Sequence, residues 1–493
     1  MSADGHGDRL SPVDASFLAL ESPSAHMHVA WTAFVAAPQG AAPTIEDLRA
    51  RVGARLASVP RCRQRLLPAP LGLSDPSWVD DPGFDVARHV VELGDPGEAM
   101  SPARFAAARD ALLSTPLDHA RPLWQLAFVR LADGRMATVG RVHHAMADGA
   151  AALSVARLAF DADGESQTAP CDVDRESQTA PATWRPAPAP SILRRVLEPL
   201  GHGAALTTRA ARDVVRACER PRSTARGVVR EAGRAAQALT EDLLPRAPGS
   251  QLNGTLGPRR VLVQHRVPLA QLRVATRGSA ATRNDAGIAV VAGALRALAL
   301  ERGAPADELK VLVPVNMRRA EEAGELGNRV SMTSVRLPLH VASPRGRLDR
   351  VQRQTERFKR RARPQGAQTM LSGFGLVPSA LRAPVLRAAA PSRFNLTISS
   401  VVGPRRAMHL FGARVEEIYP VIPLAEEQAL SIGMLAYEGH LHFGLYADPD
   451  ALPHCNRLAE LIDEEVGALL RARPHEEDTT HDARHLAAAP VGA

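Results

Sequence analysis

A repeated hexapeptide divides this chain of 493 residues into two parts. The string ESQTAP occurs at residues 165–170 and again at 176–181, inside a segment rich in Asp, Pro, Ala, Ser and Thr that spans 161–190. Such a duplication is tolerated where no packed core depends on register. We therefore expect a surface linker here. The chain is also too long for one compact core, so two domains are expected.

Helix and strand patterns alternate on both sides of this linker, which favours two α/β layers. A short helix is expected after Ser11, the N-cap, with Pro12 at its first position, and another helix after the cap Thr44. Further helices are expected at 102–113, 284–295, 348–358 and 458–470, and strands at 27–36, 121–129, 136–142, 261–267, 311–318, 330–337, 394–402, 429–437 and 440–446. The last two strands should form a hairpin.

The formal net charge of +7 could suggest a nucleic acid or an anionic membrane as partner. Lysine occurs only at Lys310 and Lys359, however, and the arginines are scattered. With no zinc-finger or RNA-binding signature, no nucleic acid partner is expected. Residues 191–245 are Ala-rich, arginine-studded and helical in pattern. This segment fits either a helix lying on an anionic membrane or a connector packed on its own domain.

The cysteines and the apolar segments point to a cytoplasmic protein. The sequence contains Cys62, Cys171, Cys218 and Cys455. They form no C-x-x-C pair, which argues against a structural metal or a disulfide framework. Residues 1–9 are polar and show no signal peptide. The most apolar helix pattern, 286–300, contains Arg296 and is too short to span a bilayer, so any membrane contact is expected to be peripheral.

Residues 143–149 read HHAMADG. They lie between a strand expected at 136–142 and a helix expected at 150–158. Groups at such a junction can be aimed into a cleft, and a neutral imidazole can accept a proton near pH 7. Asp148 and Gly149 suggest a tight loop. From this string alone, two structural histidines that cap a core strand explain the residues equally well.

Several other blocks occur in a specific order around this string. Taken together they resemble the bacterial wax ester synthase/acyl-CoA:diacylglycerol acyltransferase family, within the superfamily of chloramphenicol acetyltransferase, carnitine acyltransferases and non-ribosomal peptide condensation domains. The resemblance covers about residues 10–470, with 161–250 poorly matched. The matching blocks are LSPVD followed by FL at 10–18, Pro122-Leu123-Trp124 (PLW), HHxxxDG at 143–149, LNG at 252–254, ND at 284–285, PVxxR at 314–318 and GN at 327–328.

One block departs from the family pattern. Residues 399–404 read SSVVGP where the family usually has SNVPGP, with Ser400 in place of the Asn and Val402 in place of the first Pro. This departure weakens the idea that the turn supplies a side-chain amide to the site.

The resemblance implies two chloramphenicol-acetyltransferase-like α/β domains with mixed sheets flanked by helices and an active site at the domain interface. The implied division is an N-terminal acyltransferase domain at 1–160, a variable linker and basic helical connector at 161–250, a C-terminal acyltransferase-like domain at 251–475 and a disordered tail at 476–493. The blocks and their order make a purely structural role for the histidines the weaker interpretation.

The family reaction moves a fatty acyl group from acyl-CoA to an alcohol oxygen of diacylglycerol or of a long-chain alcohol, giving triacylglycerol or wax ester. Acyl-CoA is a co-substrate, and no cofactor is implied. The resemblance assigns the general base to His144, since a positioned histidine can take the proton of the attacking hydroxyl. His143 is expected to support the loop, with direct catalysis by His143 as the lesser alternative.

The remaining roles also follow from the resemblance. Asp148 is expected to form a structural salt bridge with Arg318. Asn284 is the side-chain candidate for the oxyanion, against the alternative that it is only a helix N-cap. Backbone amides near Gly149 or Gly403 could serve instead. Leu123 and Trp124 are expected to pack beneath the histidine strand, and Pro122 to stand at the start of the preceding strand, 121–129.

Two other functions remain open. A lipid-surface binding protein could keep this fold without turnover. Peripheral contact with the inner membrane face or a lipid droplet fits both this function and the acyltransferase. A condensation-like acyltransferase could use a carrier-bound donor, but the chain contains no carrier domain. The intact HHxxxDG string favours the acyltransferase.

Overall fold

The computed structural model describes residues 9–70, 74–149, 151–162, 184–191, 195, 245–316, 330–361, 393–401 and 403–472. Several expectations lie outside these residues. They concern Arg318, the GN block, Val402, the C-terminal tail and nearly all of the linker and the basic segment at 191–245.

The N-terminal half contributes most of one large sheet and the helices around it. Its elements are α1 (Pro12–Leu20), β1 (His28–Val35), α2 (Ile45–Arg55), η1 (Leu56–Ser58), η2 (Pro60–Arg63), β2 (Gln64–Leu67), β3 (Ser77–Asp80), α3 (Val86–His89), β4 (Val90–Glu92), α4 (Pro102–Leu113), β5 (Trp124–Arg130), β6 (Met136–His143), α5 (Ala152–Ala156) and β7 (Asp161–Ala162).

The C-terminal half contributes a second large sheet and its helices. Its elements are β8 (Val261–Pro268), α8 (Leu269–Ala275), α9 (Arg283–Glu301), β9 (Leu309–Asn316), β10 (Val330–Leu337), α10 (Pro344–Arg361), β11 (Leu396–Val401), β12 (Met408–Leu410), β13 (Ala413–Val421), β14 (Leu430–Tyr437), β15 (His440–Ala447) and α13 (Arg457–Arg471).

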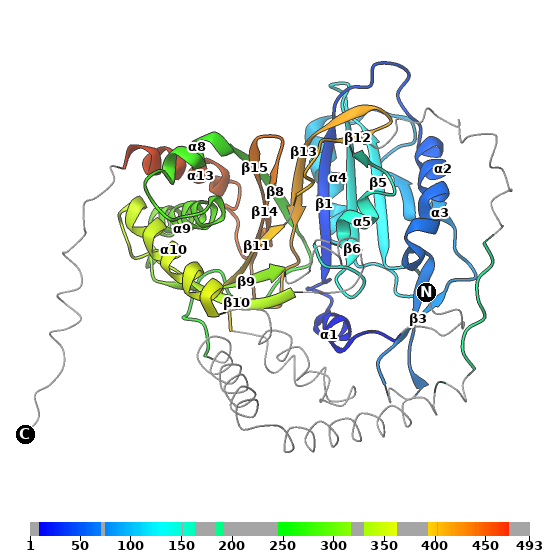
Figure 1. Cartoon of the computed structure of the whole chain (residues 1–493), viewed down its shortest axis with the longest axis horizontal. Coiled ribbons are helices and arrows are strands. Elements are labelled where there is room, and N and C mark those ends of the chain that lie inside the picture. Colours follow the sequence, from blue (N-terminus) through cyan, green and yellow to red (C-terminus); the bar gives the residue numbers. More distant parts are fainter. Residues whose placement is uncertain are drawn as a thin grey trace, which may run out of the picture.

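The two sheets lie side by side (Figure 1). Helices α8, α9, α10 and α13 cover the outer side of the second sheet, whereas α2 and α3 lie at the far side of the first. The first sheet has the order β4-β5-β6-β1-β13-β12-β7, and the second has β10-β9-β11-β14-β15-β8. Both are mixed, because β4–β5, β9–β11 and β11–β14 are parallel pairs. The expected α/β class with mixed sheets flanked by helices is confirmed.

Two strands of the first sheet come from the C-terminal half. β12 and β13 pair with each other, and β13 also pairs with β1 along Ala30–Val35. The strand pattern in the sequence missed both of them. β13 combines three charged residues with Pro420 and shows no sustained alternation. This crossing segment ties the two halves together.

The seam between the sheets is closely packed at β13. A Cβ on Gly444 would lie 1.8 Å from the carbonyl oxygen of Pro420, and a Cβ on Gly433 would lie 2.9 Å from the same atom. Any side chain at either position would push the strands apart. Glycine therefore permits β13 to rest on β14 and β15.

The local signals for helix starts are mostly confirmed. Ser11 accepts the N–H of Asp14 at the start of α1, and Thr44 forms a capping box with Asp47 at the start of α2. The expected hairpin across Glu438 is also present as β14 and β15. Two details differ. The helix after the histidine loop is a single short turn, α5, and the N-cap of α9 is Thr282 rather than Asn284.

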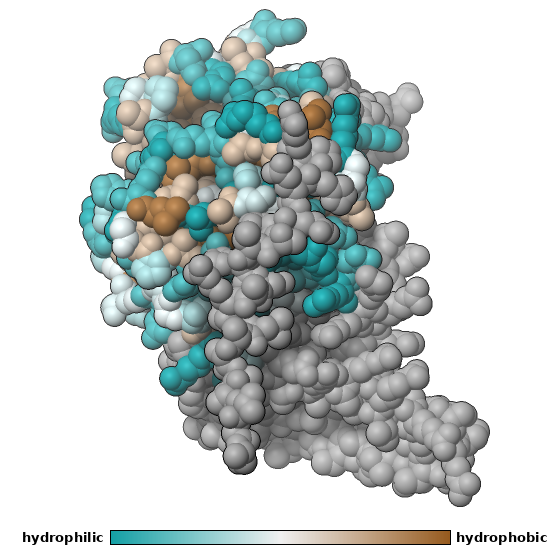
Figure 2. Space-filling view, turned by 90° about the vertical axis from the view of Figure 1, so that its left-hand side faces the viewer, coloured by the Kyte–Doolittle hydropathy of each residue, from teal (hydrophilic) through white to brown (hydrophobic). Residues whose placement is uncertain are grey.

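Figure 2 shows the helix-covered side of the C-terminal half. Hydrophilic side chains dominate its coloured surface, with small apolar patches between them. Among the described residues, the exposed large apolar side chains of this half are Val274, Leu300 and Leu470. No helix in the described part of the chain is long and apolar enough to cross a bilayer.

Candidate active site

The backbone around the histidine pair is held by hydrogen bonds from two neighbouring segments. The N–H of His143 donates to the carbonyl oxygen of Leu123 at 2.9 Å, and the N–H of His144 donates to that of Met27 at 2.8 Å. Met27 adopts φ +48°, an unusual conformation for a residue other than glycine. The PLW block and the start of β1 thus fix where β6 ends and the loop begins.

His143 is fully buried, and its ring is oriented by the loop itself. Its Nδ1 accepts the backbone N–H of Ala145 at 3.0 Å. An Nδ1 that accepts leaves the proton of the neutral ring on Nε2, which lies 3.5 Å from Oε2 of Glu21. Burial lowers the pKa of His143, although Glu21 acts in the opposite direction. His143 is therefore suited to shaping the loop.

Glu21 joins two imidazoles, those of His143 and His119. Its Oε2 lies 2.8 Å from Nε2 of His119. Burial by itself would raise the pKa of Glu21, but the interactions with His119 and His143 outweigh it and lower the pKa to about 2. The hydrogen bond to Glu21 raises the pKa of His119 above its ordinary value, against the effect of burial.

These three residues have the composition of a metal site, since their ligand atoms lie within 4.8 Å of one another. A metal would need the lone pair of His143 Nε2, whereas the bond from Ala145 N–H to Nδ1 keeps the proton on Nε2. The cluster therefore fits a carboxylate shared by two imidazoles rather than a bound metal.

His144 is half-buried and lies against α1. Its ring stacks on Phe17, with centroids 3.8 Å apart and planes 5° from parallel. Phe17 is itself a core residue. The N-terminal helix therefore fixes the plane of the imidazole that the sequence assigned as base.

Asp148 is 1% exposed and organises the loop after His144. Its Oδ1 accepts the N–H of Ala151 at 2.8 Å, and its backbone oxygen accepts that of Ala152, so it leads into α5. Its expected partner Arg318 lies outside the described residues. A Cβ on Gly149 would lie 3.5 Å from the Val401 side chain, which brings the loop against β11 of the other half.

The PLW residues lie in the core below the histidines. Leu123 is 0% and Trp124 is 1% exposed. The Trp124 indole donates to the carbonyl oxygen of Cys62 at 2.8 Å and stacks on His89. This agrees with a supporting role through the sheet, with Pro122 two residues before the start of β5.

Asn284 and Asp285, the two residues of the ND block, make different contacts. Asp285 is buried, completes the capping box with Thr282 and accepts the hydroxyl of Thr355 on α10. Asn284 is half-buried, and its Oδ1 is buried without a hydrogen-bond partner in the described part of the chain. No hydrogen bond between described residues joins Asn284 to the histidine loop.

The turn that departs from the family pattern keeps its glycine for a steric reason. A Cβ on Gly403 would lie 2.3 Å from the carbonyl oxygen of Ala436. Ser400 is exposed. The sequence therefore preserves the backbone of this turn while the Asn side chain is absent.

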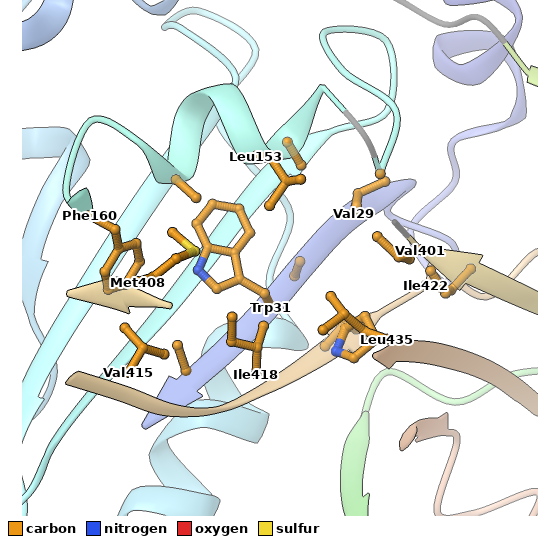
Figure 3. A pocket seen from close by; sticks show the side chains of 17 residues that line it. Val29, Trp31, Leu153, Phe160, Val401, Met408, Val415, Ile418, Ile422 and Leu435 are labelled. Carbon is orange, nitrogen blue, oxygen red and sulfur yellow. The ribbon is translucent and has the colours of Figure 1, made fainter. Parts of the chain in front are cut away.

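An apolar cavity lies beside the loop at the seam between the halves. It encloses about 540 Å³ of empty space, including the part open to solvent. Gly149 and Leu153 line it from the loop and α5, Val401 from β11 and Ile418 from β13 (Figure 3). The part of this space that the centre of a water-sized sphere can reach is only about 40 Å³, so the cavity is narrow. Its apolar lining suits a lipophilic group.

Three residues of this site were not found from the sequence: Phe17, Glu21 and His119. Phe17 stands in the recognised N-terminal block, but nothing in its spacing indicates contact with a loop more than a hundred residues away. Glu21 and His119 are isolated polar residues in the sequence, and only the fold brings them to His143.

Two sheets joined at a seam, with an HHxxxDG loop at that seam, define a protein of the chloramphenicol-acetyltransferase-like class. Solved structures agree on the fold. A wax ester synthase/diacylglycerol acyltransferase from Marinobacter aquaeolei VT8 matches with a TM-score of 0.62 at 24% identity, covering 94% of this chain and 98% of that one. The first condensation domain of the calcium-dependent antibiotic synthetase matches with a TM-score of 0.57 at 19% identity, covering 95% and 96%.

The sequence comparisons identify the family. The model of the wax ester synthase/diacylglycerol acyltransferase catalytic domain matches residues 10–287, and that of the C-terminal domain matches 326–469. Two probable diacylglycerol O-acyltransferases of Mycobacterium tuberculosis, tgs1 and tgs2, are each 31% identical over 94% of this chain, covering 96% and 99% of their own lengths. The chain belongs to the wax ester synthase/diacylglycerol acyltransferase family.

Proposed function

We propose that this acyltransferase moves a long-chain fatty acyl group from acyl-CoA to the hydroxyl of diacylglycerol, a long-chain alcohol, or both. The observation that carries the proposal is the position of His144. The residue lies in an intact HHxxxDG loop, its ring is held by Phe17, and the same loop lines an apolar cavity. Membership of the family and the names of its mycobacterial relatives support this substrate class.

The imidazole of His144 takes the proton of the acceptor hydroxyl while the alcohol oxygen attacks the thioester carbonyl. The resulting tetrahedral intermediate collapses to the ester, and the C–S bond breaks. His144 then returns its proton to the departing CoA thiolate, so no acyl-enzyme is formed. Phe17 and the backbone bond to Met27 keep the ring in place through both proton transfers.

The proposal is tested by giving purified protein palmitoyl-CoA with diacylglycerol or with hexadecanol and measuring CoA release and ester formation. The His144→Ala variant should lose about 10²- to 10⁴-fold in rate while keeping its circular dichroism spectrum. His454→Ala, which removes an exposed histidine, serves as the matched control. Near-normal turnover by His144→Ala would show that another group is the base.

For the oxyanion we propose the side-chain amide of Asn284 in the first turn of α9. Its support is the resemblance and the half-buried position of the residue in the first turn of the helix. Asn284→Asp keeps the shape and removes the donor, so kcat should fall by about 10²- to 10³-fold. An unchanged kcat would transfer this role to backbone amides near Gly149 or Gly403.

The second candidate is a lipid-surface binding protein. On helix α10 the side chains of Arg353 and Arg357 are exposed, whereas Arg347 is buried and paired with Glu465. The two exposed arginines support peripheral contact with an anionic membrane or a lipid droplet. Flotation with vesicles containing phosphatidylglycerol, at low and at high salt, tests this contact. Binding without any CoA release would favour the non-catalytic function, and CoA release in the preceding assay would exclude it.

A further inference from the structure

Trp31 is the side chain that differs most from the rest of the lining of the apolar cavity. Among the described residues that line it, only Trp31 carries a side-chain nitrogen or oxygen. In Figure 3 its indole lies between Val29 and Val401 on one side and Phe160 and Met408 on the other. The indole therefore divides the end of the cavity near the histidine loop from the end at β12.

The position of this indole depends on a glycine in the neighbouring strand. Trp31 on β1 pairs directly with Gly140 on β6. A Cβ on Gly140 would lie 2.0 Å from Cζ2 of Trp31 and 2.3 Å from Cε2, so no larger residue fits beneath the ring. The absence of a side chain at Gly140 lets the indole lie against the strand and leaves the remaining space open.

The indole N–H of Trp31 also lacks the hydrogen-bond acceptor that a purely structural tryptophan would normally have. Trp31 is 8% exposed, and its Nε1 has no hydrogen-bond acceptor in the described part of the chain. A buried donor left without an acceptor is unfavourable, and native cores rarely keep one without a reason. Phenylalanine would fill a core without this donor.

We propose that Trp31 is the specificity-determining residue of this cavity. The indole blocks the far end of the space that the acyl chain of the donor can occupy, and it thereby limits the length of the acyl group that is transferred efficiently. This inference rests on the proposed function, because it requires the acyl chain of the donor to enter the cavity beside His144. Gly149 and Leu153 place the near end of the cavity next to that loop. Each methylene that finds or loses its place in an apolar pocket changes selectivity by about tenfold or more.

The test compares octanoyl-, lauroyl-, palmitoyl- and stearoyl-CoA with one acceptor and measures kcat/KM and, by calorimetry, Kd for each. Trp31→Leu removes the far part of the ring and should raise the stearoyl-to-lauroyl ratio by about tenfold or more. Trp31→Phe keeps most of the bulk and removes the N–H, so its ratio should change less. Gly140→Ala pushes the indole into the cavity and should lower the ratio.

Phe34→Leu is the matched control, since Phe34 lies on the same strand and packs on Phe105 and Tyr419, outside the cavity. It should leave the chain-length ratio unchanged. If Trp31→Leu changes every donor equally, the inference is wrong even when turnover is normal. If the wild-type protein binds acyl-CoA without turnover, the proposed function fails, and the Kd ratios still decide the role of Trp31. No binding of any donor would overturn both.

Discussion

Glu21 determines the charge state of the histidine cluster behind the loop. Its carboxylate accepts from His119 and faces Nε2 of His143, while Ala145 fixes the tautomer of that ring. The carboxylate thereby compensates two polar rings beside the core. His143 keeps its orientation because its Nδ1 accepts the backbone N–H of Ala145, while its Nε2 lies 3.5 Å from the carboxylate of Glu21.

Glu21→Gln should weaken the fold in a defined pH window. The pKa of Glu21 is lowered from 4.5 to about 2, so its contribution is present above pH 4.5 and is lost as the pH falls toward 2. The pKa of His119 is raised from 6.5, so its contribution is present below pH 6.5 and is lost as the pH rises through the folded value. The stability difference between wild type and variant should therefore be largest between about pH 4.5 and 6.5.

Urea unfolding across this pH range measures that window, and an NMR titration of His119 should show its pKa falling in the variant. Glu46→Gln, at an exposed carboxylate paired with Arg49, is the control. A difference that does not vary with pH would contradict the shared-carboxylate arrangement.

At the scale of the element, α1 matters more than its nine residues suggest. Capped by Ser11, it presents Phe17 to His144 and ends at Glu21, which reaches His143. One short helix thus contacts both histidines of the loop. Its position is set by burial of Phe17 and Ala15 in the first core.

Phe17→Leu should lower kcat with little change in KM, because the stacked pair orients the base and contacts no substrate in this assignment. Aromatic pairs contribute about 0.5–1.5 kcal/mol beyond burial, so a rate loss of about two- to tenfold is expected. Steady-state kinetics measure it. Phe84→Leu removes a comparable stacked pair with His89 and should leave kcat unchanged. Equal effects of both variants would indicate a general loss of packing.

The two capping boxes allow a second comparison between elements. Asp285→Ala removes the cap of α9 and one of the two acceptors of the Thr355 hydroxyl, which keeps the carbonyl oxygen of Gln352, so a loss of about 1.5–3 kcal/mol is expected. Asp47→Ala removes the exposed box of α2 and should cost about 1 kcal/mol. Urea unfolding of both variants measures the difference, and equal losses would argue against a role for Thr355.

At the scale of the whole molecule, the active site depends on a seam that several buried polar groups hold together. Arg260 lies 3.3 Å from Asp448 and also donates to the carbonyl oxygen of Ser24 in the N-terminal half. Tyr446 donates to the carbonyl oxygen of Leu113 at 2.9 Å. Together with β13, which crosses between the sheets, these contacts hold the two halves of the chain against each other.

Arg260→Met should destabilise the protein by about 3–5 kcal/mol, because Asp448, at 0% exposure, would lose its buried partner. Tyr446→Phe, which keeps the shape and loses one hydrogen bond, should cost only about 0.5–1.5 kcal/mol. Chemical unfolding monitored by tryptophan fluorescence gives both values. A cost for Arg260→Met no larger than that for Tyr446→Phe would show that the pair adds little to the seam.

The sequence by itself determined the features that depend on near neighbours. The HHxxxDG string at a strand end, the caps Ser11 and Thr44 and the hairpin at Glu438 were all predicted, because periodicity and capping act within a few residues. The order of the family blocks added the class of fold and the assignment of His144. Asn284 as the possible cap of α9 was wrong, since Thr282 two residues earlier makes the capping box with Asp285.

Only the tertiary structure decided which distant residues meet. Glu21 and His119 reach His143, Phe17 covers His144, Gly140 makes room for Trp31, and β13 leaves its own half to complete the other sheet. No local pattern encodes these contacts, because they arise when two sheets are pressed together and buried polar groups must find partners across the seam. The sequence alone predicts the loop, whereas the residues that orient its histidines are brought there by tertiary packing.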